Sequence, residues 1–155
     1  MSELSHLDDR GAARMVDVGA KPETDRVAVA EAGVVLGGET RRFLFEGGLP
    51  KGDAVAVARL AAVMGAKRTP DLIPLCHPLQ LTSVSVDVEE TESGATIRVT
   101  AATTGRTGVE MEAMTGAAVG ALALYDMVKG VERGAEITPV RLVSKSGGAS
   151  GDWSR

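Results

Sequence analysis

An acid and a base three residues apart give the strongest chemical signal in this sequence. Asp126 follows the apolar run "GAAVGALALY", near the end of a helical pattern, where the helix dipole disfavours a carboxylate. Lys129 would lie on the same helical face, so the two side chains can pair. Such a pair beside an apolar wall is a proton-transfer unit with shifted pKa values, and a purely structural ion pair has the same spacing.

Two further acids stand at the start of the same helical pattern. Glu110 and Glu112 fall in its first turn, where the dipole favours negative charge, so capping explains them as well as binding does. Fourteen residues separate Glu112 from Asp126, which is roughly 21 Å along a helix axis. Within one chain they cannot both touch one small reacting centre. Either the ligand is long, as a nucleoside triphosphate is, or two subunits form the pocket.

The segment "DLIPLCHPLQL" places the only cysteine, Cys76, beside His77 and between two prolines. A structural zinc site needs about four ligands, and the only other histidine is His6 in the N-terminal arm. Adjacent residues in an extended segment point to opposite faces, so the thiol and the imidazole are poor partners for nucleophilic catalysis. The remaining interpretation is that the prolines stiffen this segment and that its backbone presents other groups to a ligand.

The basic residues are twelve arginines and only five lysines. The lysines are Lys21, Lys51, Lys67, Lys129 and Lys145. A chain that uses Arg by default keeps Lys where a compact ammonium with a movable pKa is useful, and several of these lysines have Gly neighbours, as in "LPKGD" and "SKSGGASG". They indicate a site for anionic oxygens, in which converging backbone N–H groups would assist. Solvated surface lysines and a flexible C-terminal tail are the alternatives.

Periodicity predicts the elements that would position these residues. They are a strand at 26–36, a short helix capped by Thr40 and ending at Gly47 and Gly48, a helix at 53–68 capped by Asp53 with Val57, Leu60 and Met64 on its apolar face, a hairpin of strands at 83–90 and 95–103, a helix at 109–133 and a strand at 137–143. This order predicts an α+β fold of the ferredoxin-like kind, an antiparallel sheet with helices packed on one face. Residues 1–24 are predicted to form a flexible arm, and residues 25–155 a single catalytic domain with a Gly-rich C-terminal loop.

Composition narrows the function classes. The net charge of −4 argues against a nucleic-acid binder, because duplex affinity needs a basic surface. A single cysteine forms no internal disulfide, and the acidic N-terminus is not a signal peptide. The longest weakly polar run, 113–124, falls short of the ~20 apolar residues that span a bilayer. We therefore expect a cytoplasmic protein without membrane contact.

The chain resembles the MoaC family, the cyclic pyranopterin monophosphate synthases of molybdenum cofactor biosynthesis, over almost its whole length. Five segments carry the resemblance in chain order: "MVDVGAK" at 15–21, "KGD" at 51–53, "AKRTPDLIPLCHPLQL" at 66–81, "GRTGVEMEAMTGAAVGALALYDMVK" at 105–129 and "TPVRLVSKSGGASGD" at 138–152. Five such segments in the same order are highly specific.

The resemblance implies a homohexamer built as a trimer of dimers, with pockets at the subunit boundaries. It implies a lyase that rearranges 3′,8-cyclo-7,8-dihydroguanosine 5′-triphosphate into cyclic pyranopterin monophosphate and releases pyrophosphate. It implies no redox cofactor and no bound metal, and leaves open whether Mg²⁺ accompanies the triphosphate.

By the same resemblance, Asp126 is the expected catalytic acid or base, assisted by Lys51 and Lys129. The same resemblance gives as expected substrate-binding residues Leu75, Cys76, His77, Met111, Glu112, Lys67 and Lys145, with the two lysines on phosphates. Glu110, in the first turn of the same helix, is added as a further expected substrate-binding residue. The prolines would stiffen the segment 75–77 so that it presents backbone groups and the imidazole to the ligand, and the thiol need not react.

Three positions depart from the family pattern. Arg106 stands where Lys is common, so it is not expected to titrate, although it can still contact a phosphate. Pro70 replaces a common Trp, and Ala149 sits where Lys is frequent, so one phosphate contact is expected to be missing. Two rival functions remain: a non-catalytic nucleotide-binding oligomer and a purely structural assembly module.

Overall fold

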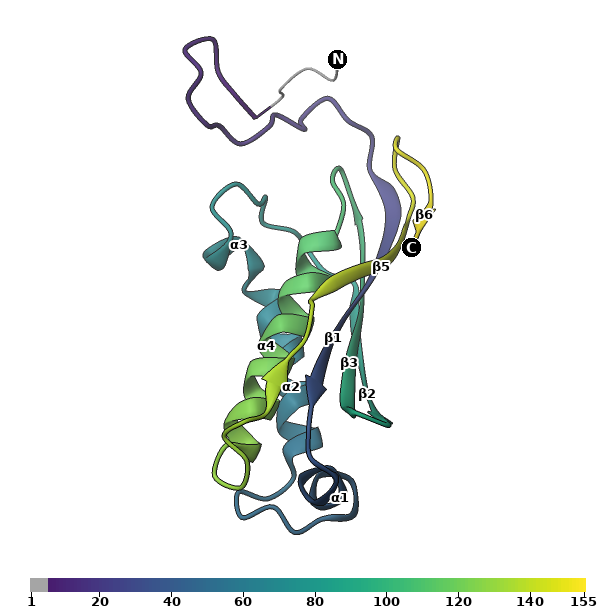
Figure 1. Ribbon diagram of the computed structural model, residues 1–155. Helices are drawn as coiled ribbons and strands as arrows, with labels where there is room; N and C mark the ends of the chain where they lie inside the picture. The colour runs from purple at the N-terminus through teal and green to yellow at the C-terminus, as the bar shows by residue number, and fades with distance from the viewer. Residues whose placement is uncertain (1–5) are drawn as a thin grey trace.

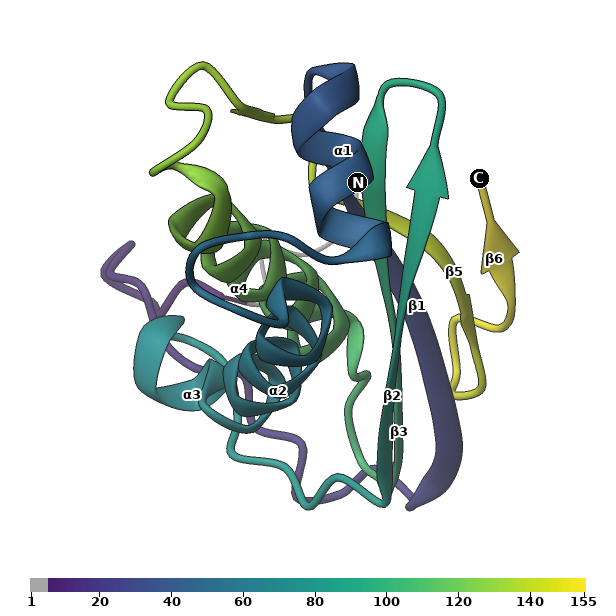
Figure 2. The same cartoon turned by 90° about the horizontal axis from the view of Figure 1, so that it is seen from below.

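The computed structural model describes residues 6–155 and shows one sheet with helices against one of its faces (Figures 1 and 2). The elements are β1 (Thr24–Val35), α1 (Gly38–Glu46), α2 (Ala54–Lys67), α3 (Thr69–Leu72), β2 (Ser83–Thr91), β3 (Gly94–Gly105), α4 (Glu110–Val128), β4 (Glu136–Ile137), β5 (Arg141–Ser146) and β6 (Trp153–Ser154). The strands lie in the order β2-β3-β1-β5-β6, and β4 also pairs with β1. Every pairing is antiparallel. The predicted α+β fold is confirmed.

Strand β1 is central because β3 pairs along one of its edges and β5 along the other. Its side chains alternate, so that Ala28, Ala30 and Ala32 are buried under the helices. The predicted hairpin is confirmed as β2 and β3, which turn at Glu92 and Ser93. The sheet therefore supplies the surface on which the helices pack.

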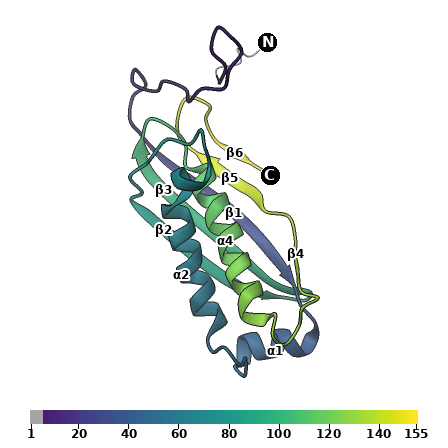
Figure 3. The same cartoon turned by 90° about the vertical axis from the view of Figure 1, so that its left-hand side faces the viewer.

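Helices α2 and α4 lie side by side on this face of the sheet (Figure 3). Small residues line the contact between them. Every fourth residue of α2 is a buried alanine: Ala54, Ala58, Ala62 and Ala66. The approach is so close that a Cβ added at Gly116 of α4 would lie 3.0 Å from the carbonyl oxygen of Ala62. The predicted cap of α2 is confirmed, because the Asp53 side chain accepts a hydrogen bond from the N–H of Ala56 at 2.9 Å.

The apolar face predicted for α2 is wrong. Val57, Leu60 and Met64 point away from the core, and Leu60 is 68% exposed. Only small side chains fit between two helices that approach this closely, so the alanines face α4 and the larger apolar residues face outward. Leu122 of α4 is also exposed, which leaves an uncovered apolar stripe on the helix layer of the single chain.

The start predicted for α1 is also wrong. Thr40 is buried inside the helix, and the N-cap is Gly37. The N–H of Gly37 donates to both carboxylate oxygens of Glu132, at 3.0 and 3.1 Å. Glu132 lies 95 residues further along the chain, so a distant acid holds the N-cap residue, and no side chain caps the first turn of α1. The end of α1 at Gly47 is confirmed, with a positive φ of 94°.

The C-terminal third is more divided than predicted. The helix expected to reach residue 133 ends at Val128, followed by a turn in which the N–H of Val131 donates to Val128. The strand expected at 137–143 is split into β4 and β5, because Pro139 between them has no N–H for a sheet. Helix α3 and strand β6 were not predicted. Within residues 6–155, no helix is long and apolar enough to cross a membrane.

Candidate active site

Asp126 lies near the C-terminal end of α4, and two ammonium groups hold its carboxylate. Lys129 Nζ lies 2.7 Å from one carboxylate oxygen, and Lys51 Nζ lies 3.0 Å from the other. Lys51, from the loop before α2, also donates to the backbone carbonyl of Asp126 at 2.7 Å. Helical spacing paired Asp126 only with Lys129, and the fold brings in Lys51, which the family resemblance implied, from 75 residues away. These three residues are called the acid–lysine cluster below.

Pairing sets the protonation state of the acid–lysine cluster. Hydrogen bonds from Lys129 and then Lys51 hold the pKa of Asp126 below its usual range, and the same contact raises the pKa of Lys129. Burial plays little part, since the Asp126 side chain is 56% exposed in the single chain. At neutral pH the cluster therefore offers an ionised carboxylate, which can accept a proton, beside ammonium groups that can donate one.

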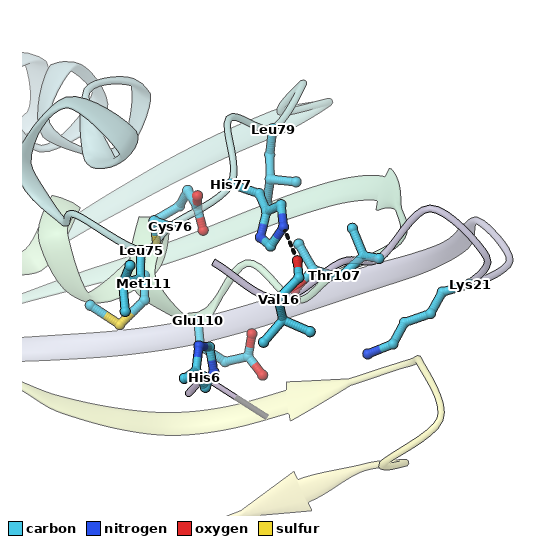
Figure 4. Close-up of a pocket in the computed structure, with 13 residues that line it drawn as sticks. His6, Val16, Lys21, Leu75, Cys76, His77, Leu79, Thr107, Glu110 and Met111 are labelled. Carbon is cyan, nitrogen blue, oxygen red and sulfur yellow. Dashed lines mark hydrogen bonds between the residues drawn. The ribbon is translucent and has the colours of Figure 1, made fainter. Parts of the chain in front are cut away.

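A cavity of about 400 Å³ near the opposite end of α4 brings together six of the eight predicted substrate-binding residues (Figure 4). These are Leu75, Cys76, His77, Glu110, Met111 and Glu112. The first three come from the loop before β2, and the others from the first turn of α4. It is called the glutamate cavity below.

Other residues of the glutamate cavity were not predicted. The segment 6–23, called the arm below, contributes His6, Val16, Val18 and Lys21, and the turn before α4 contributes Thr107 and Gly108. Three of these arm residues fall within the motif "MVDVGAK". The family resemblance therefore pointed to this segment, but no binding role was assigned to its individual residues. For His6 no comparable signal exists.

Glu112 is the most unusual side chain of the glutamate cavity. It is only 2% exposed, and neither carboxylate oxygen accepts a hydrogen bond from the described residues. Burial raises the pKa of Glu112, and the charge of Glu110 raises it further. A buried carboxylate without a donor is costly in free energy. The cavity is therefore suited to a ligand that brings N–H groups to this wall.

The thiol and the imidazole do not form a reacting pair. Burial raises the pKa of the Cys76 thiol, and the charges of Glu112 and Glu110 raise it further, so the thiol stays protonated at neutral pH. His77 turns instead to the arm, where its Nε2 lies 2.7 Å from the carbonyl oxygen of Val16. Neither residue is arranged as a nucleophile or its base.

The two lysines expected on phosphates lie in different surroundings. Lys145 lies 3.3 Å from Glu110 at the edge of the glutamate cavity and donates to the Ser150 hydroxyl at 2.8 Å. Lys67 lines a neighbouring cavity that shares Leu79 with the glutamate cavity. In the Gly-rich C-terminal loop, the N–H of Gly147 already donates to the Asp152 carboxylate at 3.1 Å, so a ligand anion would have to displace that side chain.

The described chain holds no cluster suited to a metal ion, since residues 6–155 contain no group of three or more His, Cys, Asp or Glu side chains that could ligate one. The acid–lysine cluster lies at the C-terminal end of α4 and the glutamate cavity at its N-terminal end. Glu112 and Asp126 are thus roughly 21 Å apart along the helix axis in a single chain.

Together, the fold and the two clusters define an α+β protein that keeps an acid–base group apart from a binding cavity. The MoaC family profile matches residues 15–148. The chain is 54% identical over 154 residues to the cyclic pyranopterin monophosphate synthase of Brucella ovis, an alignment that covers 98% of this chain and 93% of the relative. It is 56% identical to the synthase of the same name from Thermomicrobium roseum, covering 100% of this chain and 95% of that one. The chain belongs to the MoaC family.

Proposed function

We propose that this protein is a lyase that converts 3′,8-cyclo-7,8-dihydroguanosine 5′-triphosphate into cyclic pyranopterin monophosphate with release of pyrophosphate, in molybdenum cofactor biosynthesis. The observation that carries the proposal is the acid–lysine cluster, in which Asp126 lies 2.7 Å from Lys129 and 3.0 Å from Lys51. The chain belongs to the MoaC family, and the names of its relatives give the product. The substrate is the one that the family resemblance implies.

The cluster suits the proton transfers that such a rearrangement needs. Bonds around a guanine-derived ring break and re-form, so a group must take up protons and another must return them. The ionised Asp126 carboxylate would accept a proton, and Lys129 or Lys51 would donate one or stabilise the negative charge that develops. The same ammonium groups would help to neutralise the departing pyrophosphate.

The glutamate cavity suits the ring of the substrate. A guanine-derived heterocycle carries N–H donors along one edge, and the Glu112 oxygens are buried acceptors without donors. Leu75 and Met111 offer apolar contacts beside it. Lys145, 3.3 Å from Glu110, and Lys67, in the neighbouring cavity, would meet the phosphates, as the family resemblance implies.

A complete site would require two copies of the chain. The two clusters lie too far apart in one copy for the reacting centre, but a two-fold pairing brings the Asp126 end of one helix toward the Glu112 end of its partner if the helices cross in opposite directions. The exposed apolar stripe of Val57, Leu60, Met64 and Leu122 supports a partner on the helix layer. We propose a homohexamer, a trimer of dimers, with pockets between subunits.

The proposed reaction requires no redox cofactor, because it rearranges the substrate without net oxidation. Mg²⁺ would accompany the triphosphate rather than occupy a protein site, so chelation should act through the substrate. We place the enzyme in the cytoplasm, with no nucleic-acid or membrane partner.

The substitution Asp126→Asn tests the proposal. Purified protein is incubated with the cyclic triphosphate, and product and pyrophosphate are measured. We expect turnover to fall about 10²- to 10⁴-fold, the range for loss of a general acid or base, while substrate binding and assembly persist. The matched control Glu136→Gln removes an exposed acid of β4 and should keep full turnover. Normal turnover by Asp126→Asn would refute the catalytic role and favour a non-catalytic nucleotide-binding oligomer.

A further inference from the structure

The arm is tied to the rest of the protein by very few polar contacts. Among the described residues, the Nε2 of His77 and the carbonyl oxygen of Val16 form the one hydrogen bond between the arm and residues 24–155. The other link is an ion pair between Glu23 and Arg106, at 3.7 Å and half-exposed at the very root of the arm. The position of the arm over the glutamate cavity therefore depends strongly on one histidine.

The arm is otherwise organised by itself. The Asp8 carboxylate accepts the N–H groups of Arg10 and Ala12, at 2.9 and 2.8 Å, which closes a turn before Val16. The Asp17 carboxylate accepts the N–H of Gly19 at 2.8 Å, which closes a second turn just after it. The hydrogen bond to His77 falls between these two turns, where a single contact can place both of them.

The chemistry of this contact fixes the state of the imidazole. A carbonyl oxygen only accepts hydrogen bonds, so Nε2 must carry the proton that is donated to Val16. In the neutral ring, Nδ1 is then unprotonated and is the only nitrogen left to accept a hydrogen bond from a ligand. Figure 4 shows the ring turned toward Val16, on the side of the cavity where the arm passes.

We propose that His77 is a positioning residue: its Nε2–H clasps the Val16 carbonyl and so holds the arm as a wall of the glutamate cavity. The wall brings Lys21, a cation, to a cavity that otherwise presents Glu110 and Glu112. Opening the clasp would move Val16, Val18 and Lys21 away together and leave the cavity open on that side. This inference rests on the proposed function only for the identity of the ligand.

Trypsin cleavage of the full-length protein without ligand tests the clasp directly. The enzyme needs an extended stretch around the bond after Arg14, and this stretch includes Val16, so cleavage reports how often the arm opens. The substitution His77→Asn removes the donor at the ε position, and we expect cleavage after Arg14 to be about fivefold faster or more. His77→Gln places an amide N–H near the position of Nε2 and should restore the slow rate.

The other histidine supplies the matched control. His6 lies on the arm, and the structure gives its ring no hydrogen bond within the described residues, so His6→Asn should leave the cleavage rate unchanged. Equal rates in the wild type and His77→Asn would overturn the clasp. So would a His77→Gln variant that is cleaved as fast as His77→Asn, or an equal acceleration by His6→Asn.

Two further readouts keep the proposal testable if a variant folds poorly. Nitrogen-15 NMR of the wild type should show a proton on Nε2 of the His77 ring, and a ring protonated on Nδ1 alone would overturn the clasp. In the activity assay, His77→Asn should raise KM more than it lowers kcat, with recovery in His77→Gln. An inactive wild type with clasp-dependent cleavage would refute the proposed function and leave the clasp standing.

Discussion

Glu112 and Asp126 lie near opposite ends of α4, and their carboxylates have contrasting surroundings. Asp126 is more than half exposed and has two ammonium partners, and its pKa is lowered. Glu112 is almost completely buried, has no hydrogen-bond partner among residues 6–155, and has a raised pKa. The charged form of Asp126 is stabilised by two lysines of the chain. The described residues offer no comparable donor to Glu112.

This difference shows how one fold assigns different tasks to similar groups. A carboxylate with its partners in place is held ionised and needs little from the ligand. A buried carboxylate without donors gains most when a ligand provides them, so it is prepared for recognition. The sequence places both acids on one helix, but only the environment distinguishes their roles.

The largest expected effect comes from mixing chains that are defective at opposite ends. Asp126→Asn and Glu112→Gln proteins, denatured together in equal amounts and refolded, should form mixed dimers in which one of the two shared pockets is intact. Random pairing then restores about a quarter of wild-type activity, while each parent alone retains a tenth or less, because a lost charge-assisted hydrogen bond costs about 1.5 to 3 kcal/mol. Rates of product formation measure this. A mixture no more active than its parents would place the whole site within one chain.

The next effect separates the two lysines at the exposed end. Replacing Lys129 by Met should lower turnover about 10- to 100-fold by removing a charge-assisted hydrogen bond. It should also let the pKa of Asp126 rise toward its ordinary value, which moves the acid limb of the pH–rate profile to higher pH. Lys51→Met should do the same to a smaller degree, since Lys129 makes the shorter contact and is the larger cause of the shift. Unmoved profiles in both variants would exclude Asp126 as the titrating group.

Much of the fold follows from local patterns in the sequence. The alternating valines of β2, the turn before β3 and the Asp53 cap of α2 depend on neighbouring residues, and all were predicted. The start of α1 was misplaced because the N-cap residue is a glycine, Gly37, and the acid that accepts its N–H, Glu132, lies far along the chain. The outward face of α2 was misassigned because large residues were assumed to be buried, although the alanines at every fourth position gave the signal of a close helix contact.

The site was predictable in its residues and much less so in its geometry. The spacing of Glu112 and Asp126 gave their separation correctly, because a helix has a fixed rise per residue. The contact of Lys51 with Asp126 and the arm along the glutamate cavity arise from tertiary packing, which no local pattern encodes. The absence of any donor to Glu112 is likewise a property of its surroundings.

A smaller effect concerns stability as a function of pH. The pKa of Glu112 is raised on folding above its ordinary value of 4.5, so the stability present below that pH is lost as the pH rises through the folded pKa. Glu112→Gln should remove this loss and flatten the dependence of the unfolding free energy on pH. Asp126→Asn should act with the opposite sign, since a lowered pKa contributes stability that is lost as the pH falls below 3.8. Urea unfolding from pH 3 to 8 measures both, and parallel curves for the two variants would contradict the contrast.

The smallest effect tests how the exposed end is held. Asp53 caps α2 directly after the loop that delivers Lys51, so Asp53→Ala should cost about 1 kcal/mol and lower the melting temperature by about 3 °C. Asp87→Ala, an exposed acid of β2 that caps nothing, serves as the control and should change stability by a few tenths of a kcal/mol. Thermal unfolding followed by circular dichroism compares the two. An equal loss in both variants would mean that the cap contributes nothing.

The alanine and glycine contact between α2 and α4 has a consequence for the assembled enzyme. A Cβ added at Gly65 would lie 2.7 Å from the Cβ of Val119, so the helices are already as close as their backbones and side chains allow. The two helices therefore act as one rigid unit. In the proposed dimer, the distance between the two shared pockets would stay constant whichever ligand each pocket holds. A larger residue at Gly65 or Gly116 would push the helices apart and disturb both pockets at once, although neither position contacts the substrate.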